Sequence, residues 1–128
     1  MADAKDAAQA EAYSVLAAGV SGAPIYEDVP ANTPPPIVVL GDCASEPIGG
    51  KDDHDEQVSI DVLTLVSAEE KAPLNALQGQ IKALLRGHKA VRDGFELHFL
   101  FGNETARLDD DGVTYVGTTT FSVMAFAT

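Results

Sequence analysis

A segment rich in proline constrains the fold of this chain more than any other feature. Residues 21–36 contain five prolines and end directly before the apolar run Ile-Val-Val-Leu at residues 37–40. Proline has a fixed φ and no backbone N–H, so the segment cannot form a helix or donate to the ladder of a sheet. We therefore predict a long connection between an alanine-rich helix and a β-rich remainder, held to the core by Ile25 and Tyr26. Connections of this length in a compact domain usually make functional contacts.

Length, composition and charge narrow the class of protein. The 128 residues, 45% of them apolar, are enough for one domain (residues 1–128) with a buried core. The sequence has no apolar run long enough for a membrane span, and its beginning does not resemble a secretory signal. The formal net charge of −12 argues against a protein that grips nucleic-acid phosphates with lysine and arginine. Cys43 is the only cysteine, so no disulfide within the chain is expected.

Two helices are predicted from the spacing of apolar residues. The first covers residues 3–18, and Gly19 is expected to be its C-cap. The second follows a capping box, Ser-Ala-Glu-Glu at residues 67–70, and runs to about Arg86. Its apolar face consists of Leu74, Leu77, Ile81, Leu84 and Leu85.

Four strands are predicted, in two antiparallel hairpins. Residues 37–46 and 57–66 form the first hairpin, with a long polar tip between them. The second consists of a strand with an apolar stripe that starts at Phe95 and a final strand over residues 113–126. Residues 87–94 are expected to be a short basic loop. The order α-β-β-α-β-β predicts an α+β fold, with a mainly antiparallel four-stranded sheet and two helices packed on one face.

The motifs that resemble active-site sequences all lack a required residue. Ser21 is not in a nucleophile elbow, because Ala23 stands where that motif needs its second glycine. Gly50 and Lys51 resemble a phosphate-binding loop, but Asp52 stands where that loop needs serine or threonine. We therefore expect no catalytic residue, no cofactor and no enzymatic activity.

The tip of the first hairpin leaves a second interpretation open. Residues 52–56, Asp-Asp-His-Asp-Glu, offer several oxygen atoms of the kind that hard divalent cations prefer. Their spacing matches no calcium-binding loop, and charged tips are usually solvated, so no metal is expected. A small acidic module that binds a metal or another ligand through residues 52–56 remains the alternative from a different functional class.

The order and spacing of several motifs resemble the tail-completion, or tail-terminator, family of long-tailed bacteriophages, prophages and gene transfer agents. The resemblance covers essentially the whole chain. It is carried by residues 25–30 (Ile-Tyr-Glu-Asp-Val-Pro), by the paired prolines before the strand that reaches Leu40-Gly41, and by Ser-Glu-Pro at residues 45–47. The helix that closes on residues 84–87 and the final hairpin agree with it. Two features differ, because Ile37 stands where many relatives carry an aromatic residue and the chain has no tryptophan.

The resemblance implies an assembly protein in the virion, at the head-proximal end or neck of the tail. It implies a ring, most often of six copies, that stops growth of the tail tube and offers a joining surface to the head. The implied partners are other copies of the chain, the tail-tube protein and the head–tail connector or stopper protein. DNA would pass through the ring without specific binding, no membrane is involved, and assembly takes place in the bacterial cytoplasm. Another ring protein of the neck fits the resemblance as well.

Three loops are predicted to make the contacts of such a ring: residues 21–36, 47–56 and 87–94. Recognition usually lies in loops that are held by a rigid scaffold. A closed ring requires two different patches of each copy to meet. Lys89 and Arg92 are expected to pair with acidic patches of a neighbouring copy. The residues predicted at ring or partner contacts are Tyr26, Asp28, Ile48, Lys51, Asp52, Asp53, His54, Asp55, Lys89 and Arg92.

Overall fold

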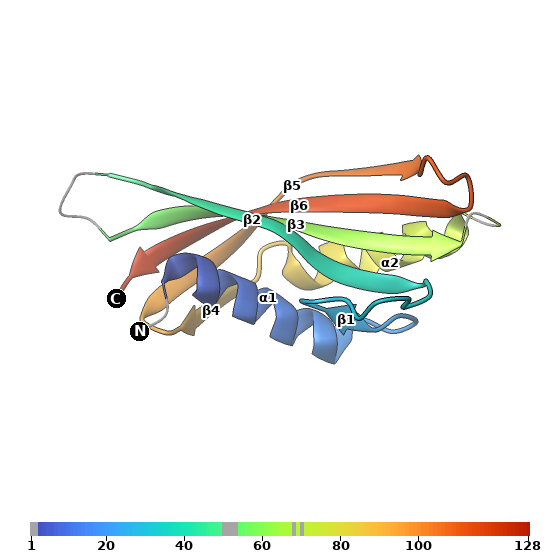
Figure 1. Cartoon of the computed structure of the whole chain (residues 1–128). Helices are drawn as coiled ribbons and strands as arrows, with labels where there is room; N and C mark the ends of the chain where they lie inside the picture. Colours follow the sequence, from blue (N-terminus) through green and yellow to red (C-terminus); the bar gives the residue numbers. More distant parts are fainter. Residues whose placement is uncertain (1–2, 50–53, 68, 70) are drawn as a thin grey trace.

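A curled sheet of six strands, with two helices on one of its faces, makes up the fold (Figure 1). The structure is a computed structural model that describes residues 3–49, 54–67, 69 and 71–128. The strand order is β1-β2-β3-β6-β5-β4, and every neighbouring pair is antiparallel except the parallel pair β1–β2. The predicted α+β class and the mainly antiparallel sheet are confirmed, but the predicted number of four strands is wrong.

The helices and the long strands lie close to their predicted ranges. Helix α1 spans Ala4–Gly19 and helix α2 spans Ala72–Leu85. Within the described ranges, neither helix is long and apolar enough to cross a membrane. The strands are β1 (Ile25–Tyr26), β2 (Ile37–Pro47), β3 (Glu56–Ser67), β4 (Lys89–Arg92), β5 (Phe95–Leu108) and β6 (Thr114–Ala127).

Two short strands account for the difference from the predicted sheet. In β1, Ile25 and Tyr26 pair with Val38 and Val39 of β2. Strand β4 lies in the segment predicted as a basic loop and pairs with the first four residues of β5. The two are joined by Asp93 and Gly94, which both have positive φ angles, 52° and 85°. Two positive φ angles are typical of the tight two-residue turns of hairpins, so the segment reverses and pairs.

Helix α1 packs on the sheet and on α2 through small side chains. Asp3 caps the helix, because its side chain accepts a hydrogen bond from the backbone N–H of Asp6. Gly19 is the last helical residue and Val20 the C-cap, so the predicted glycine cap is wrong. Gly19 lies close to α2, since a Cβ there would lie 2.7 Å from a methyl carbon of Leu84 and that side chain would have to shift. The side chains that α1 buries completely are Ala4, Ala7, Ala8, Ala12 and Leu16.

The beginning of α2 differs from the predicted capping box. The N-cap is Lys71, whose side chain makes no capping hydrogen bond, and Pro73 lies in the first turn. Proline is favoured there because its missing N–H would have no partner in the helix. Ser67, the predicted cap, is instead the last residue of β3 and pairs with Thr114 of β6. Ala68 and Glu70 of the predicted box lie outside the described residues.

One apolar core joins the stripe of β5 to the helices. Leu97 and Phe99 are buried in the same cluster as Ile81 and Leu85 of α2, which confirms the predicted packing of strand on helix. Phe101 lies at the margin of this core with its ring edge-on to Phe121 of β6. A smaller cluster lies under the first turns of α2 and consists of Val66, Leu74 and Leu77.

One stretch of the helix-free face of the central strands is polar and internally hydrogen-bonded. The hydroxyl of Thr120 in β6 donates to the carboxylate of Asp61 in β3 at 2.8 Å. The amide Nε2 of Gln57 in β3 donates to the hydroxyl of Ser122 in β6 at 2.9 Å. These contacts join the same two strands that their backbone ladder joins.

The two long strands near the margins of the sheet are only partly paired on their outer sides. Strand β1 pairs with β2 at Val38 and Val39. Strand β4 pairs with the first four residues of β5, and His88, the residue before β4, extends this pairing to Phe99. In the described part of the chain, no strand pairs with the outer side of residues 41–47 of β2 or of residues 100–108 of β5. We call these segments the open β2 edge and the open β5 edge.

Candidate interaction surfaces

The seven predicted interface residues that the structure describes fall into three places in the fold. Tyr26 is half-buried in β1 and Asp28 is exposed in the connection that follows. Ile25 packs against the main core, as predicted for an anchor of this connection. Their place is at the end of the sheet opposite the tip of the β2–β3 hairpin (Figure 1).

The second group lies at the base of the β2–β3 tip. The N–H of Ile48 donates to the carbonyl of Asp55 at 3.0 Å, which continues the hairpin beyond the two strands. The carboxylate of Asp55 accepts a hydrogen bond from the N–H of Ala127 at 2.9 Å and so ties the hairpin to the end of β6. His54 is exposed. The remaining predicted residues of this tip lie outside the described part of the chain: Lys51, Asp52 and Asp53.

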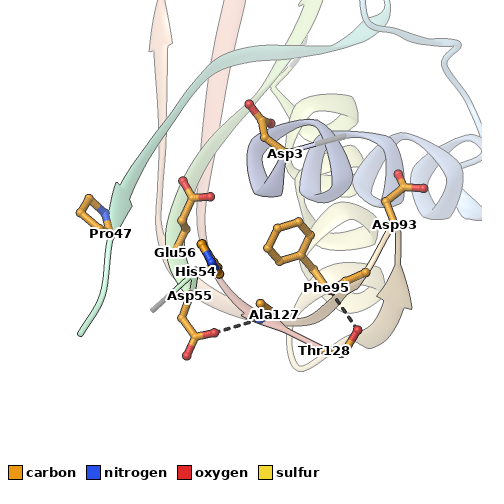
Figure 2. Close-up of a pocket in the computed structure, with 10 residues that line it drawn as sticks. Asp3, Pro47, His54, Asp55, Glu56, Asp93, Phe95, Ala127 and Thr128 are labelled. Atoms are coloured by element: carbon orange, nitrogen blue, oxygen red, sulfur yellow. Dashed lines mark hydrogen bonds between the residues drawn. The ribbon is translucent and has the colours of Figure 1, made fainter. Parts of the chain in front are cut away.

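An acidic hollow with a cavity volume of about 680 Å³ lies beside this base. Figure 2 shows the ring of Phe95 in the middle of the hollow, between residues of α1, of the β2–β3 hairpin and of the β4–β5 turn. Among the described residues, none of the carboxylates that line it has an ion-pair partner. Such a surface repels anions. The acidic residues concerned are Asp3, Asp55, Glu56 and Asp93.

The described residues do not contain a metal centre. No group of three or more histidine, cysteine, aspartate or glutamate side chains in the described ranges could hold a metal ion. Three residues of the predicted acidic cluster, His54, Asp55 and Glu56, line the hollow. The other two, Asp52 and Asp53, lie outside the described part.

The third group, Lys89 and Arg92, belongs to β4, which is tied to α1 by one carboxylate. Glu11 of α1 has a side chain only 12% exposed and accepts hydrogen bonds from Nε2 of His88 at 2.7 Å and from Nε of Arg92 at 3.0 Å. Burial by itself would raise the pKa of Glu11, but the hydrogen bonds from His88 and Arg92 and their positive charge hold it below its ordinary value. Arg92 therefore has an ionic partner within its own chain, whereas Lys89 is exposed.

Several residues at these surfaces were not predicted from the sequence. Glu11 of α1 is paired with Arg92 of β4 by the fold, and Asp93 and Phe95 line the hollow together with Asp3 and Glu56 of other elements. One local signal was present, because an Asp-Gly pair such as residues 93–94 is typical of two-residue hairpin turns. Of the predicted residues, His54 and Asp55 line the hollow and Arg92 directly precedes its Asp93, whereas Tyr26 pairs with Val39 near the other end of β2.

Comparisons with known proteins agree with the fold. A protein-family model described as Tail completion protein gp17 matches residues 7–125. No curated protein sequence matches the chain. A solved structure described as the virion of a native gene transfer agent (GTA) particle contains a similar chain. The similarity covers 98% of this chain and 96% of that one, with a TM-score of 0.77 and 21% sequence identity, which shows a shared fold.

Proposed function

This chain belongs to the tail completion protein gp17 family, and we propose that it acts there as a tail terminator, a ring that caps the tail tube and ends its growth. The membership confirms the predicted resemblance and the structural role in the tail of a virion. The observation that carries the proposal is the extent of the family match, which includes both helices and all six strands apart from a few terminal residues.

We propose that the ring contains six copies and has one face toward the tail tube and one toward the head connector or stopper protein. The open β2 and β5 edges support a ring, because they are two different patches on opposite sides of one sheet. Heterologous contacts between two such patches can close into a ring. The exposed loops at both ends of the molecule are then available to the two neighbouring proteins (Figure 1).

DNA is proposed to pass through the ring without specific binding. The chain has 20 acidic and only 8 basic residues, so its average surface repels phosphates rather than holding them. In this role the protein needs no chemistry, and we propose that it has no enzymatic activity. We favour an assembly protein over a metal-binding module because the family match covers nearly the whole chain and points to a structural role in the tail.

The decisive experiment measures mass and tube length together. Light scattering is recorded on the protein alone and with its tail-tube protein, and electron microscopy follows tube polymerisation with and without the chain. We expect a sixfold mass, alone or with the tube protein, and tubes that stop growing once the ring is bound. A monomer that leaves tube growth unchanged would overturn the proposal. A sixfold ring that binds the connector but leaves tube growth unchanged would assign it to the neck instead.

A further inference from the structure

We propose that neighbouring copies join edge to edge, the open β5 edge of one copy pairing antiparallel with the open β2 edge of the next. The inference rests on the proposed ring and identifies the contact that builds it. Main-chain hydrogen bonds would supply the affinity, as in other cases where a strand is added to an exposed sheet edge.

The first argument is the exposure of both edges. Residues 44–47 of β2 and residues 102–105 of β5 are exposed, whichever face of the sheet their side chains occupy. Neither helix nor loop of the described chain covers them. Each backbone N–H and C=O is an obligatory hydrogen-bonding group, and a bare strand edge is a template for another strand. Pro47 ends the first edge, and the second contains no proline or lysine that would discourage pairing.

The second argument is the direction of the strands. Strands β2, β3, β6 and β5 follow one another across the sheet, each antiparallel to the last, so β2 and β5 run in opposite directions. When a second copy is placed beside the first with its helices on the same side, its β2 therefore lies antiparallel to the β5 of the first. The contact joins two different patches and leaves one free edge at each end, which allows the array to close.

The third argument concerns register. Within one copy, Thr105 pairs with Thr118, Thr118 pairs with Leu63, and Leu63 pairs with Val39. Thr105 and Val39 therefore lie at the same level across the sheet. Displacing the next copy by four residue spacings, about 13 Å along the strands, brings Ala44 opposite Thr105, because β2 has an extra residue between Leu40 and Cys43. Ala44 and Thr105 both lie on the helix-free face, as paired residues must. At this offset β1 and β4 lie beyond the ends of the new pair, so neither blocks it.

The fourth argument is charge. The open β2 edge has two acidic residues, Asp42 and Glu46, and no basic one, so pairing two β2 edges would bring carboxylates together. Like charges across a strand pair are destabilising. The open β5 edge contains Arg107, whose Nη1 lies 3.5 Å from Oδ1 of Asp109 in an exposed ion pair. The register with Ala44 opposite Thr105 sets the same guanidinium opposite Asp42 of the next copy. The carboxylate of Glu104 already has a partner in its own chain, Lys82, at 3.0 Å.

Cysteine cross-linking tests this contact. In a Cys43→Ala background the chain has no other cysteine, so Ala44→Cys and Thr105→Cys can be combined and oxidised under conditions in which light scattering detects the ring, including the tail-tube protein if it is needed. We expect a reducible ladder of covalent multimers that ends at the number of copies in the ring. The matched control replaces Ala44→Cys by Ser59→Cys, an exposed residue of β3 on the same face, and should give no ladder. Circular dichroism confirms that each variant is folded.

The outcomes separate this contact from the proposed function. If a ring forms but neither this pair nor the adjacent pairs Glu46→Cys with Asn103→Cys and Asp42→Cys with Arg107→Cys cross-link, the edge contact is wrong and the ring stands. If each single-cysteine variant forms covalent dimers as readily as the double variant, like edges pair and the heterologous contact is wrong. If light scattering finds no ring with or without the tube protein, the proposed function fails and this contact fails with it.

Discussion

Gln78 of α2 lies directly against Gly117 of β6, and its Nε2 donates a hydrogen bond to the backbone carbonyl of Thr105 in β5 at 2.9 Å. The side chain of Gln78 is buried. One amide therefore connects the helix to the strand whose outer side is the open β5 edge. The close approach requires a residue without a side chain at position 117.

Replacing Gly117 by alanine should destabilise the fold. The new Cβ would lie 2.8 Å from Cδ1 of Leu74 and would collide with the amide of Gln78. We expect a loss of about 1–3 kcal/mol in the free energy of unfolding, as is typical of overpacking, measured by urea denaturation. Gly79→Ala is the control, because this helical glycine has nothing within 4 Å of its added Cβ. It should gain about 0.5–1 kcal/mol from helix propensity, and equal stabilities of the two variants would contradict the packing described.

Replacing Glu11 by glutamine should loosen β4 from α1. The amide keeps the shape of the side chain but loses the charge that His88 and Arg92 face. We expect a loss of about 1.5–3 kcal/mol, the range for hydrogen bonds to charged groups, measured by urea denaturation at neutral pH. Glu27→Gln, at an exposed position in the connection, should change stability by less than about 0.5 kcal/mol.

The contribution of Glu11 should depend on pH in one direction. Because the pKa of Glu11 is lower in the folded chain than its ordinary value, its ionised form stabilises the fold above that ordinary value. The contribution is lost as the pH falls from there through the folded pKa. The stability difference between wild type and Glu11→Gln should therefore be largest at neutral pH and shrink below about pH 4. A difference that stays constant down to pH 3 would show that the charge of Glu11 does not matter.

Cys43 should react slowly with thiol reagents in the folded protein. Burial raises the pKa of its thiol, as do the nearby carboxylates of Asp3, Asp6 and Asp61, although Lys5 acts against them. Less thiolate is then present at neutral pH, and the thiolate is the reactive form. We expect labelling by a chromogenic disulfide reagent to be several-fold slower than in urea. A Ser59→Cys variant in a Cys43→Ala background, with its thiol at an exposed position of β3 outside the proposed edge contact, should react at nearly the same rate in both conditions.

The predictable parts of the fold are the strands and helices with one buried face, because apolar residues then recur along the sequence at a regular spacing. Val58, Ile60 and Val62 alternate along β3 because one side of the strand is buried. Leu74, Leu77 and Ile81 recur at helical spacing for the same reason. Strand β1 has only two residues and exists through its pairing with β2, so no period could reveal it. The Ser67 capping pattern failed because pairing with Thr114 continues the strand instead.

The candidate surfaces were less predictable than the fold. The hollow takes Asp3 from the cap of α1, Glu56 from β3 and Asp93 from a turn, and no local pattern links such distant positions. The open edges are defined by where β1 and β4 stop pairing, which depends on two strands that the sequence did not predict. The charged tip and the basic residues of β4 could be found by composition alone, but their intrachain partners could not.

The hydrogen-bonded face formed by Asp61, Thr120, Gln57 and Ser122 bears on the shape of any assembly. These four side chains already pair with one another across two strands, so covering this polar stretch would bury little apolar surface. Backbone N–H and C=O groups that lack a strand partner in the described chain lie instead along the open β2 and β5 edges. Copies that join along these edges therefore leave the hydrogen-bonded stretch of the broad side in contact with water.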